Sequence, residues 1–251
     1  MMTDQLTEKD FNDSIRYASY IQAALLPDLE DFKRILPDSF VFYRPRDIVS
    51  GDFYWIAKQR NRIAITAADC TGHGVPGAFM SIMGINFLNQ IASPCIPNSA
   101  KMLNLMREYV MKAMHQKGEV DDQKDGIDMS LIVIDLEKEQ LEFSGANNPL
   151  IYFYKDELIV IKGDRMPIGI SPIAEEAFTK HIIPFHKVDS FYIFSDGYAD
   201  QFGGYKYKKL KFKGFKQILR EINNQSIPDQ YNEIEKKLKK WMMHYNQIDD
   251  I

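Results

Sequence analysis

Two short stretches constrain the fold of this chain more than any others. Residues 49–55 read Val-Ser-Gly-Asp-Phe-Tyr-Trp, and residues 68–77 read Ala-Asp-Cys-Thr-Gly-His-Gly-Val-Pro-Gly. In each, an aspartate lies beside an apolar run typical of a β-strand, close to glycine. Asp196 and Asp249 recur in similar places later in the chain. Four carboxylates at strand ends, with few histidines, predict a site for a hard, oxygen-liganded divalent cation.

The set of four aspartates matters more than any single one. An aspartate next to glycine is most simply a turn former. Asp52, Asp69, Asp196 and Asp249 together are harder to explain in that way. Two magnesium or manganese ions about 3.5–4 Å apart can share one water and lower its pKa, so that no serine or cysteine nucleophile is needed. The pattern therefore indicates an enzyme that acts on phosphate.

Composition excludes several other classes of protein. The chain has 251 residues, of which 45% are hydrophobic and 26% charged, as is usual for a globular protein. A net charge of -4 argues against general nucleic-acid binding. No apolar run approaches the roughly 20 residues of a membrane span, and the polar N-terminus does not resemble a secretory signal. The presence of only two cysteines fits a reducing cytoplasm.

The first part of the chain predicts a helix over residues 7–26. The residues that would share one face of this helix, its seam, follow one another at intervals of four, three, four and three positions, as in a heptad repeat. One of them is polar. The members of the seam are Phe11, Ile15, Ala18, Gln22 and Leu25. One interpretation is a helix packed on its own domain, and the other is a coiled-coil or dimer helix that connects to an upstream sensor domain. We therefore divide the chain into a helix and linker, 1–36, and a main domain, 37–251.

The main domain predicts strands and helices in separate groups rather than in strict alternation. Expected strands cover 40–43, 52–57, 62–68, 129–134, 140–144, 150–154, 158–161 and 189–194. Expected helices cover 76–91, 98–116, 213–223 and 229–245, with a charged loop over 119–126. Close turns between several of the strands predict antiparallel hairpins. This order indicates an α+β fold.

Several motifs, in this order, resemble the metal-dependent PPM-type (type 2C) serine/threonine phosphatases. The resemblance is strongest to the bacterial branch of stage II sporulation and stress-response phosphatases. It covers roughly residue 40 to the C-terminus, and its motifs are highly specific. The segments that carry it are Gly51-Asp52-Phe53-Tyr54, 69–78, Ser144–Leu150, Met166–Gly169, Phe194–Gln201 and Asp249–Ile251.

The resemblance implies an αββα four-layer sandwich of two antiparallel sheets flanked by helices, after the N-terminal connector helix. It also implies two divalent cations, Mn²⁺ or Mg²⁺, at one end of the sheets. Asp52 and Asp69 match metal ligands, and Asp69 would bridge the two ions. The main-chain ligand corresponds to the backbone carbonyl of Cys70. Asp196 and Asp249 match ligands of the first metal, although Asp250 competes with Asp249 for that role.

Several other residues lie near these motifs. His73 would lie beside the site, and a hydrogen bond to the neighbouring loop is favoured over proton transfer. Asp128 is either a turn residue, which is favoured, or a ligand of a third metal. No residue matches a phosphate-binding arginine, and Arg44 and Arg46 are expected in salt bridges at the rim.

Two further departures from the family pattern concern Trp55 and the last motif. Trp55 replaces an acidic residue of many relatives and is expected to alter the rim. The family continues beyond the position of Ile251 with an apolar strand, so this last strand is expected to be missing from the sequence given.

The sequence therefore predicts a cytoplasmic phosphatase that hydrolyses phosphoserine or phosphothreonine on a signalling protein. The resemblance adds an anti-sigma-factor antagonist as the expected substrate. Two alternatives stay open: a non-catalytic module that keeps the fold but signals by binding and dimerising, and a phosphatase of small molecules. A lysine run over 206–216 is either a solvated face or a docking site for an acidic phosphoprotein.

Overall fold

The computed structural model describes residues 8–117, 124–171 and 176–251. Its helices are α1 (Glu8–Leu25), α2 (Leu29–Ile35), α3 (Gly74–Ala92), α4 (Ser99–Ala113), α5 (Gly197–Asp200), α6 (Lys211–Ile222) and α7 (Ile227–Met242). Its strands are β1 (Phe53–Gln59), β2 (Arg62–Cys70), β3 (Gly126–Asp135), β4 (Gln140–Ala146), β5 (Leu150–Tyr154), β6 (Glu157–Ile161), β7 (Ile168–Gly169), β8 (His181–Pro184), β9 (Ser190–Tyr192), β10 (Phe202–Gly203) and β11 (Lys208–Lys209).

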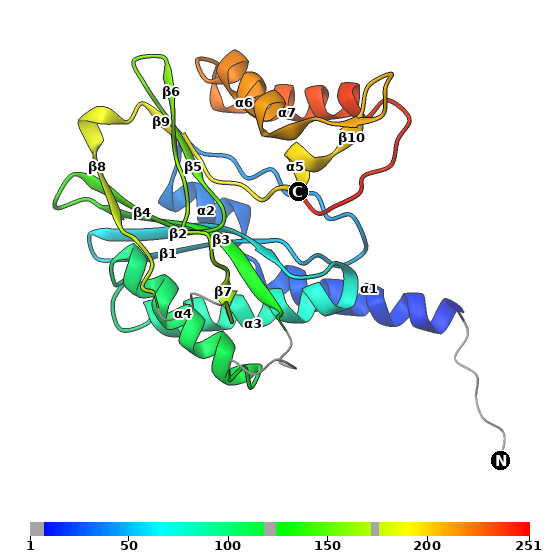
Figure 1. Ribbon diagram of the computed structural model, residues 1–251, viewed down its shortest axis with the longest axis horizontal. Helices are drawn as coiled ribbons and strands as arrows, with labels where there is room; N and C mark the ends of the chain where they lie inside the picture. Colours follow the sequence, from blue (N-terminus) through cyan, green and yellow to red (C-terminus); the bar gives the residue numbers. More distant parts are fainter. Residues whose placement is uncertain (1–7, 118–123, 172–175) are drawn as a thin grey trace.

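The strands form two larger sheets and one small hairpin, all antiparallel. The first sheet has the order β1-β2-β3-β4-β8, and β7 pairs with the start of β3. The second sheet has the order β6-β5-β9, while β10 and β11 pair with each other. Helices α3 and α4 lie along one side of the first sheet, and α6 and α7 lie beyond the second sheet (Figure 1). The predicted α+β class and antiparallel pairing are confirmed.

Three clusters of buried residues hold these elements together. The first joins α3 and α4 to the first sheet, as in the contacts around Leu88, Met102 and Leu131. The second, around Phe153, Leu219 and Leu238, joins β5 to α6 and α7. The third lies between the two sheets. Successive side chains of β2 point to opposite faces of the first sheet, and they therefore belong to different clusters. Ala64 belongs to the first cluster, while Ile63 and Ile65 belong to the third.

Helix α1 confirms the helix expected near the N-terminus, but its two halves differ. The N-terminal half extends beyond the body of the molecule (Figure 1). The C-terminal half is anchored by Gln22, which is buried. Its amide group donates to the carbonyl oxygen of Ser50 at 2.6 Å and to the hydroxyl of Ser81 at 2.8 Å, and its oxygen accepts from the backbone N–H of Ser50 at 3.0 Å. The polar member of the heptad seam therefore fixes the helix to its own domain.

The structure corrects the sequence expectations in several places. Residues 40–43 are not a strand, because no neighbouring chain pairs with them in the described ranges. The sequence did not predict helices α2 and α5, strands β7 and β8, or the β10–β11 hairpin. Most of the charged loop expected over 119–126 lies outside the described residues. Within the described ranges, none of the helices has the length and apolar character that crossing a bilayer requires.

Candidate functional site

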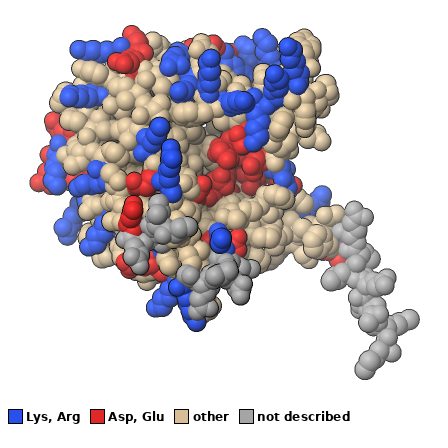
Figure 2. Space-filling view, in the orientation of Figure 1, with Lys and Arg blue, Asp and Glu red and all other residues tan. Residues whose placement is uncertain are grey.

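Four chain segments bring the predicted carboxylates to one end of the sheets. Asp52 directly precedes β1, and Asp69 is the last residue but one of β2. Asp196 lies at the start of α5, and Asp249 lies in the C-terminal segment after α7. The negative charges of Asp52, Asp196 and Asp249 all act on the Asp69 carboxylate, so the four groups are neighbours. Figure 2 shows acidic side chains gathered in a hollow at this end of the molecule.

These carboxylates are in an environment that opposes their ionisation. Burial raises the pKa of Asp69 well above its ordinary value, and the charge of Asp52 raises it further. Burial likewise raises the pKa of Asp52, with added repulsion from Asp250. Burial and the charge of Asp249 raise the pKa of Asp196 to about 6. Repulsion among grouped carboxylates at neutral pH would be relieved by a bound cation.

The donor chemistry fits the predicted divalent cations. All the grouped side chains offer carboxylate oxygens, the ligands that magnesium and manganese prefer. Asp52 is 6% exposed, and its Oδ2 atom is buried without a hydrogen-bond partner in the described part of the chain. Across residues 8–117, 124–171 and 176–251, no three histidine, cysteine or acidic side chains are already arranged as the ligands of a metal ion. The site therefore offers suitable carboxylate oxygens, and the side chains would have to move closer together to coordinate a cation.

Close contacts between glycines position the backbone of Cys70. A Cβ atom on Gly77 would lie 2.3 Å from the carbonyl oxygen of Gly72, and one on Gly51 would lie 2.6 Å from the same atom. The 70–77 loop can therefore pack against the residue before Asp52 only because these positions lack side chains. The Cys70 thiol is buried, which raises its pKa. The thiol is thus poorly suited to bind a cation, and the backbone carbonyl is the remaining donor of Cys70.

The two C-terminal aspartates differ in their contacts. Asp250 is 3% exposed, and its carboxylate accepts backbone N–H groups from Arg46 at 2.7 Å and Gly51 at 2.8 Å. Among the described residues, the carboxylate of Asp249 accepts a hydrogen bond from the N–H of Asp250 alone, at 3.0 Å, and its charge acts on Asp69 and Asp196. Asp250 therefore holds the 46–51 loop in place, whereas Asp249 faces the other carboxylates.

His73 lies at the rim of the site rather than among the carboxylates. Its Nδ1 atom is 2.5 Å from a guanidinium nitrogen of Arg46 and 3.4 Å from Oδ2 of Asp47. Arg46 also pairs with Asp47 at 2.7 Å, as expected for a rim salt bridge. Arg44, by contrast, makes its described contacts through its backbone. The contacts of His73 are thus with the neighbouring loop.

Contrary to what the sequence had indicated, Trp55 does not lie at the rim of the site, and Asp128 does not lie in a turn. Trp55 is 2% exposed in the first core cluster, and its Nε1 donates to Asn89 of α3 at 2.8 Å, so it does not shape the rim. Asp128 is a residue of β3 opposite Asp69, not a turn residue. Its carboxylate accepts from the side-chain amide of Asn147 at 2.8 Å.

Sequence reasoning included Lys209 in the lysine run over 206–216 but did not place it beside the carboxylates. The ammonium group of Lys209 in β11 lies 2.5 Å from the carboxylate of Asp200 at the end of α5. The charges of Asp196 and Asp249 also act on Lys209, which places it near the carboxylate cluster. Asp200 follows Asp196 by one helical turn, and that spacing was the available signal.

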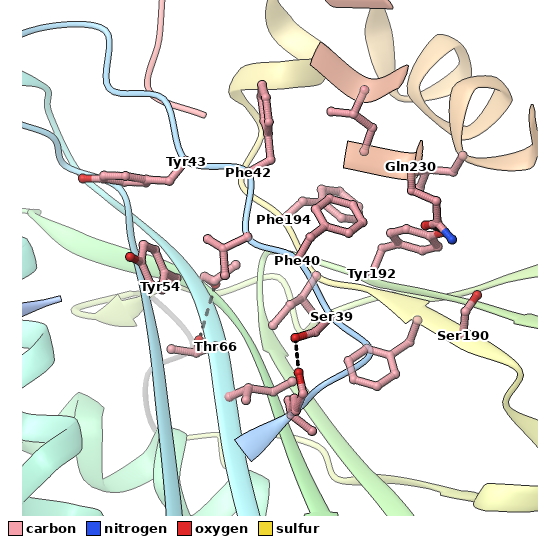
Figure 3. Close-up of a pocket in the computed structure, with 18 of the residues that line it drawn as sticks. Ser39, Phe40, Phe42, Tyr43, Tyr54, Thr66, Ser190, Tyr192, Phe194 and Gln230 are labelled. Carbon is pink, nitrogen blue, oxygen red and sulfur yellow. Dashed lines mark hydrogen bonds between the residues drawn. The ribbon is translucent and has the colours of Figure 1, made fainter. Parts of the chain in front are cut away.

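A cavity of about 620 Å³ extends from Asp52 between the two sheets and towards α6 and α7. Figure 3 shows that Phe40, Phe42, Tyr192 and Phe194 line it. Asp52 and Ser195 also line it, so the cavity continues directly from the site. Its walls are predominantly apolar.

Strand β9 and residues 39–43 border this cavity without pairing with each other. Strand β9 pairs with β5 alone among the described strands, so its other edge is open. Residues 39–43 belong to no helix or strand. Arg44 and Ile251 exchange both backbone hydrogen bonds, at 2.6 and 3.0 Å, as in one antiparallel pair of a β-ladder.

Comparisons with known proteins agree with the motifs and the fold. The sequence model of the family described as Stage II sporulation protein E (SpoIIE) matches residues 59–251. The chain belongs to the SpoIIE family of PP2C-type phosphatase domains. No curated protein matches the chain significantly.

Three solved structures illustrate the similarity. The SiaA-PP2C domain of Pseudomonas aeruginosa is 29% identical, with a TM-score of 0.85, over 97% of this chain and 95% of that chain. The PP2C phosphatase domain of SpoIIE from Bacillus subtilis, solved with a fragment of its regulatory domain, is 18% identical, with a TM-score of 0.62, over 85% of this chain and 62% of that chain. RsbX in complex with magnesium is 16% identical, with a TM-score of 0.55, over 83% of this chain and 88% of that chain. The last two similarities concern the fold alone.

Proposed function

We propose that this chain is a metal-dependent phosphatase that hydrolyses phosphoserine or phosphothreonine on a signalling protein. The observation that carries the proposal is the convergence of Asp52, Asp69, Asp196 and Asp249 from four separate segments in a member of the SpoIIE family. RsbX, which shares the fold, was crystallised with magnesium, which supports Mn²⁺ or Mg²⁺ as the cofactor. We place this activity in the cytoplasm.

The roles of the residues follow from their surroundings. Asp52, Asp69, Asp196, Asp249 and the carbonyl of Cys70 would hold two cations. Such cations would lower the pKa of a bound water and neutralise the phosphoryl oxygens during in-line displacement. Asp69 is suited to a bridging position because the charges of the other three carboxylates act on it. Asp250 keeps the 46–51 loop against the site, and His73 with Arg46 and Asp47 forms one side of the rim.

The substrate class can be tested with the purified protein. We expect Mn²⁺-dependent release of phosphate from phosphoserine and phosphothreonine peptides, with a higher kcat/KM than for sugar phosphates or nucleotides. A preference for the small molecules would indicate the small-molecule alternative instead. The expected natural substrate is an anti-sigma-factor antagonist, as the resemblance to the stress-response branch implies.

We further propose that the arrangement is the αββα sandwich of the family and that its boundary with the N-terminal segment lies near residue 36. Three separate core clusters, one for each interface between successive layers, support the sandwich. The cavity supports the expectation of one more strand in the second sheet. An extended segment following Ile251 would continue the ladder that Arg44 and Ile251 begin, and it would lie between residues 39–43 and β9.

The alternative of a binding and dimerising module rests on α1. Its exposed apolar side chains are Phe11, Tyr17, Tyr20 and Ile21, which are 48–70% exposed. We propose this surface as the contact for a second copy or an upstream sensor domain. The purified chain is expected to dimerise in light scattering, and a Phe11→Ser/Tyr20→Ser variant is expected to be monomeric. A dimer without phosphatase activity would favour the non-catalytic module.

A further inference from the structure

The lysine surface beside the carboxylate site is the feature that the proposed activity does not explain. We define it as the exposed residues Lys206, Lys208, Lys211 and Lys213, from the β10–β11 hairpin to the start of α6. Figure 2 shows basic side chains in an arc next to the acidic hollow. Because the whole chain has a net charge of -4, this concentration of positive charge is a local feature.

The hairpin is fixed to the segment that carries Asp249. The backbone N–H of Leu210 donates to the carbonyl oxygen of Gln201 at 3.0 Å. The side chain of Gln201 accepts from the N–H of Ile248 at 3.2 Å and donates to the carbonyl oxygen of Asn246 at 2.9 Å. Lys209 adds its ion pair with Asp200, four residues after Asp196. The lysine surface is therefore held at a constant position relative to the carboxylates.

The lysines of this surface are not neutralised by neighbouring carboxylates. In the described part of the chain, no ion pair within 4.0 Å involves any of the four. Helix α7 provides a contrast, because Lys236 pairs with Glu233 at 2.7 Å, Lys237 with Glu221 at 2.7 Å and Lys239 with Glu235 at 2.6 Å. These three lysines of α7 are thus paired with glutamates, whereas the four lysines of the lysine surface are not paired with a carboxylate in the described part of the chain.

The tip of the hairpin also exposes aromatic surface. Tyr205 is 95% exposed, and Tyr207 is 52% exposed. Tyr207 stacks on Phe202 with ring centroids 4.7 Å apart and contacts Tyr245 at 4.6 Å, so it is held in place. Tyrosine is enriched at surfaces that bind proteins.

We propose that the lysine surface docks the acidic residues that flank the phosphorylated residue of a protein substrate. This inference rests on the proposed phosphatase function and specifies its substrate class. As a phosphopeptide approaches the site, the adjacent unpaired lysines would attract acidic residues that flank its phosphate. Acidic residues a few positions from the phosphate would lie over the hairpin, with Tyr205 available for contact.

The test compares two phosphoserine peptides of equal length, one with acidic and one with neutral flanking residues, with an aryl phosphate as the reference substrate. The docking variant is Lys206→Gln/Lys208→Gln/Lys211→Gln/Lys213→Gln. The control variant, Lys236→Gln/Lys237→Gln/Lys239→Gln/Lys240→Gln, removes the same charge from α7. Lys209 is left unchanged because it pairs with Asp200 next to the site. Rates are measured with Mn²⁺, and circular dichroism checks that both variants fold.

We expect the wild type and the control variant to prefer the acidic peptide by about tenfold in kcat/KM, mainly through faster encounter. The docking variant is expected to lose this preference. The preference should also shrink between about 0.1 M and about 1 M salt, where the screening length falls from about 10 Å to about 3 Å.

Three outcomes would overturn the proposal. These are equal rates for both peptides in the wild type, a preference that survives in the docking variant, and a preference that disappears equally in the control variant. Failure of the phosphatase function itself looks different, because the wild type would then hydrolyse neither the peptides nor the aryl phosphate.

Discussion

At the scale of single residues, neighbouring aspartates with the same chemistry have different tasks. Both Asp249 and Asp250 were candidates from sequence, because a doublet gives no indication of which side chain turns inward. Hydrogen bonds with backbone N–H groups distinguish the two residues. Asp250 accepts two main-chain N–H groups and is buried, while Asp249 faces the other carboxylates. The same substitution at the two positions should therefore have opposite effects.

Asp250→Asn is expected to lower the free energy of unfolding by about 1.5–3 kcal/mol, because a charged acceptor of buried N–H groups is lost. Asp249→Asn is expected to stabilise the metal-free protein, because it removes repulsion from the cluster, and to weaken Mn²⁺ binding. Urea unfolding in EDTA, with Mn²⁺ titration by calorimetry, measures both effects. Destabilisation by Asp249→Asn together with an unaffected Asp250→Asn would reverse the two assignments.

At the scale of elements, the amphipathic helices and hairpins could be predicted from sequence. Strand β5 was predicted with its observed bounds, and α6 and α7 were within three residues of theirs. These elements have periodic apolar patterns that local physics determines. Residues 40–43 have an equally apolar pattern but form no strand, because a strand requires a partner that local sequence does not specify. The short β10–β11 hairpin has too few residues for a pattern.

The unpaired edges beside the cavity lead to a prediction about an added strand. A variant with five alternating apolar and polar residues after Ile251 is expected to melt at a higher temperature, because the added segment pairs with 39–43 and β9. Each kcal/mol of added stability corresponds to about 2–4 °C for a domain of this size. An extension of equal length with prolines at alternate positions is the control, since proline cannot complete the ladder. Equal melting temperatures for both extensions would show that the cavity does not accept a strand.

At the scale of the whole molecule, the two sheets position residues from distant segments at one end. The sequence could name Asp52, Asp69, Asp196 and Asp249 because each lies in a motif that resembles those of the phosphatase family. It could not place Trp55, which the strand register turns towards α3, or Lys209, whose partner Asp200 lies across the hairpin base. Such placements depend on long-range packing, which local patterns do not encode.

The grouped carboxylates predict how the stability of the metal-free protein depends on pH. Since burial raises the pKa of Asp196 to about 6 and those of Asp52 and Asp69 above their ordinary values, the folded state binds more protons than the unfolded state. The stability that these groups contribute is complete below their ordinary pKa and is lost as pH rises through the raised values.

Thermal unfolding in EDTA is therefore expected to show a falling Tm from about pH 5 to about pH 8, with a smaller fall in Asp69→Asn. Added Mn²⁺ should restore the Tm at the higher pH, because the cation binds the ionised carboxylates. Identical pH profiles for wild type and Asp69→Asn would contradict the clustering of these groups.

The central claim is that Asp69 and its neighbours hold the cations of a phosphatase. The most direct measurement is hydrolysis of an aryl phosphate as a function of Mn²⁺ concentration, in the wild type and in Asp69→Asn. We predict saturable, Mn²⁺-dependent activity in the wild type and background rates in the variant, with both proteins folded by circular dichroism. Wild-type rates in Asp69→Asn, or activity that persists in EDTA, would contradict the account.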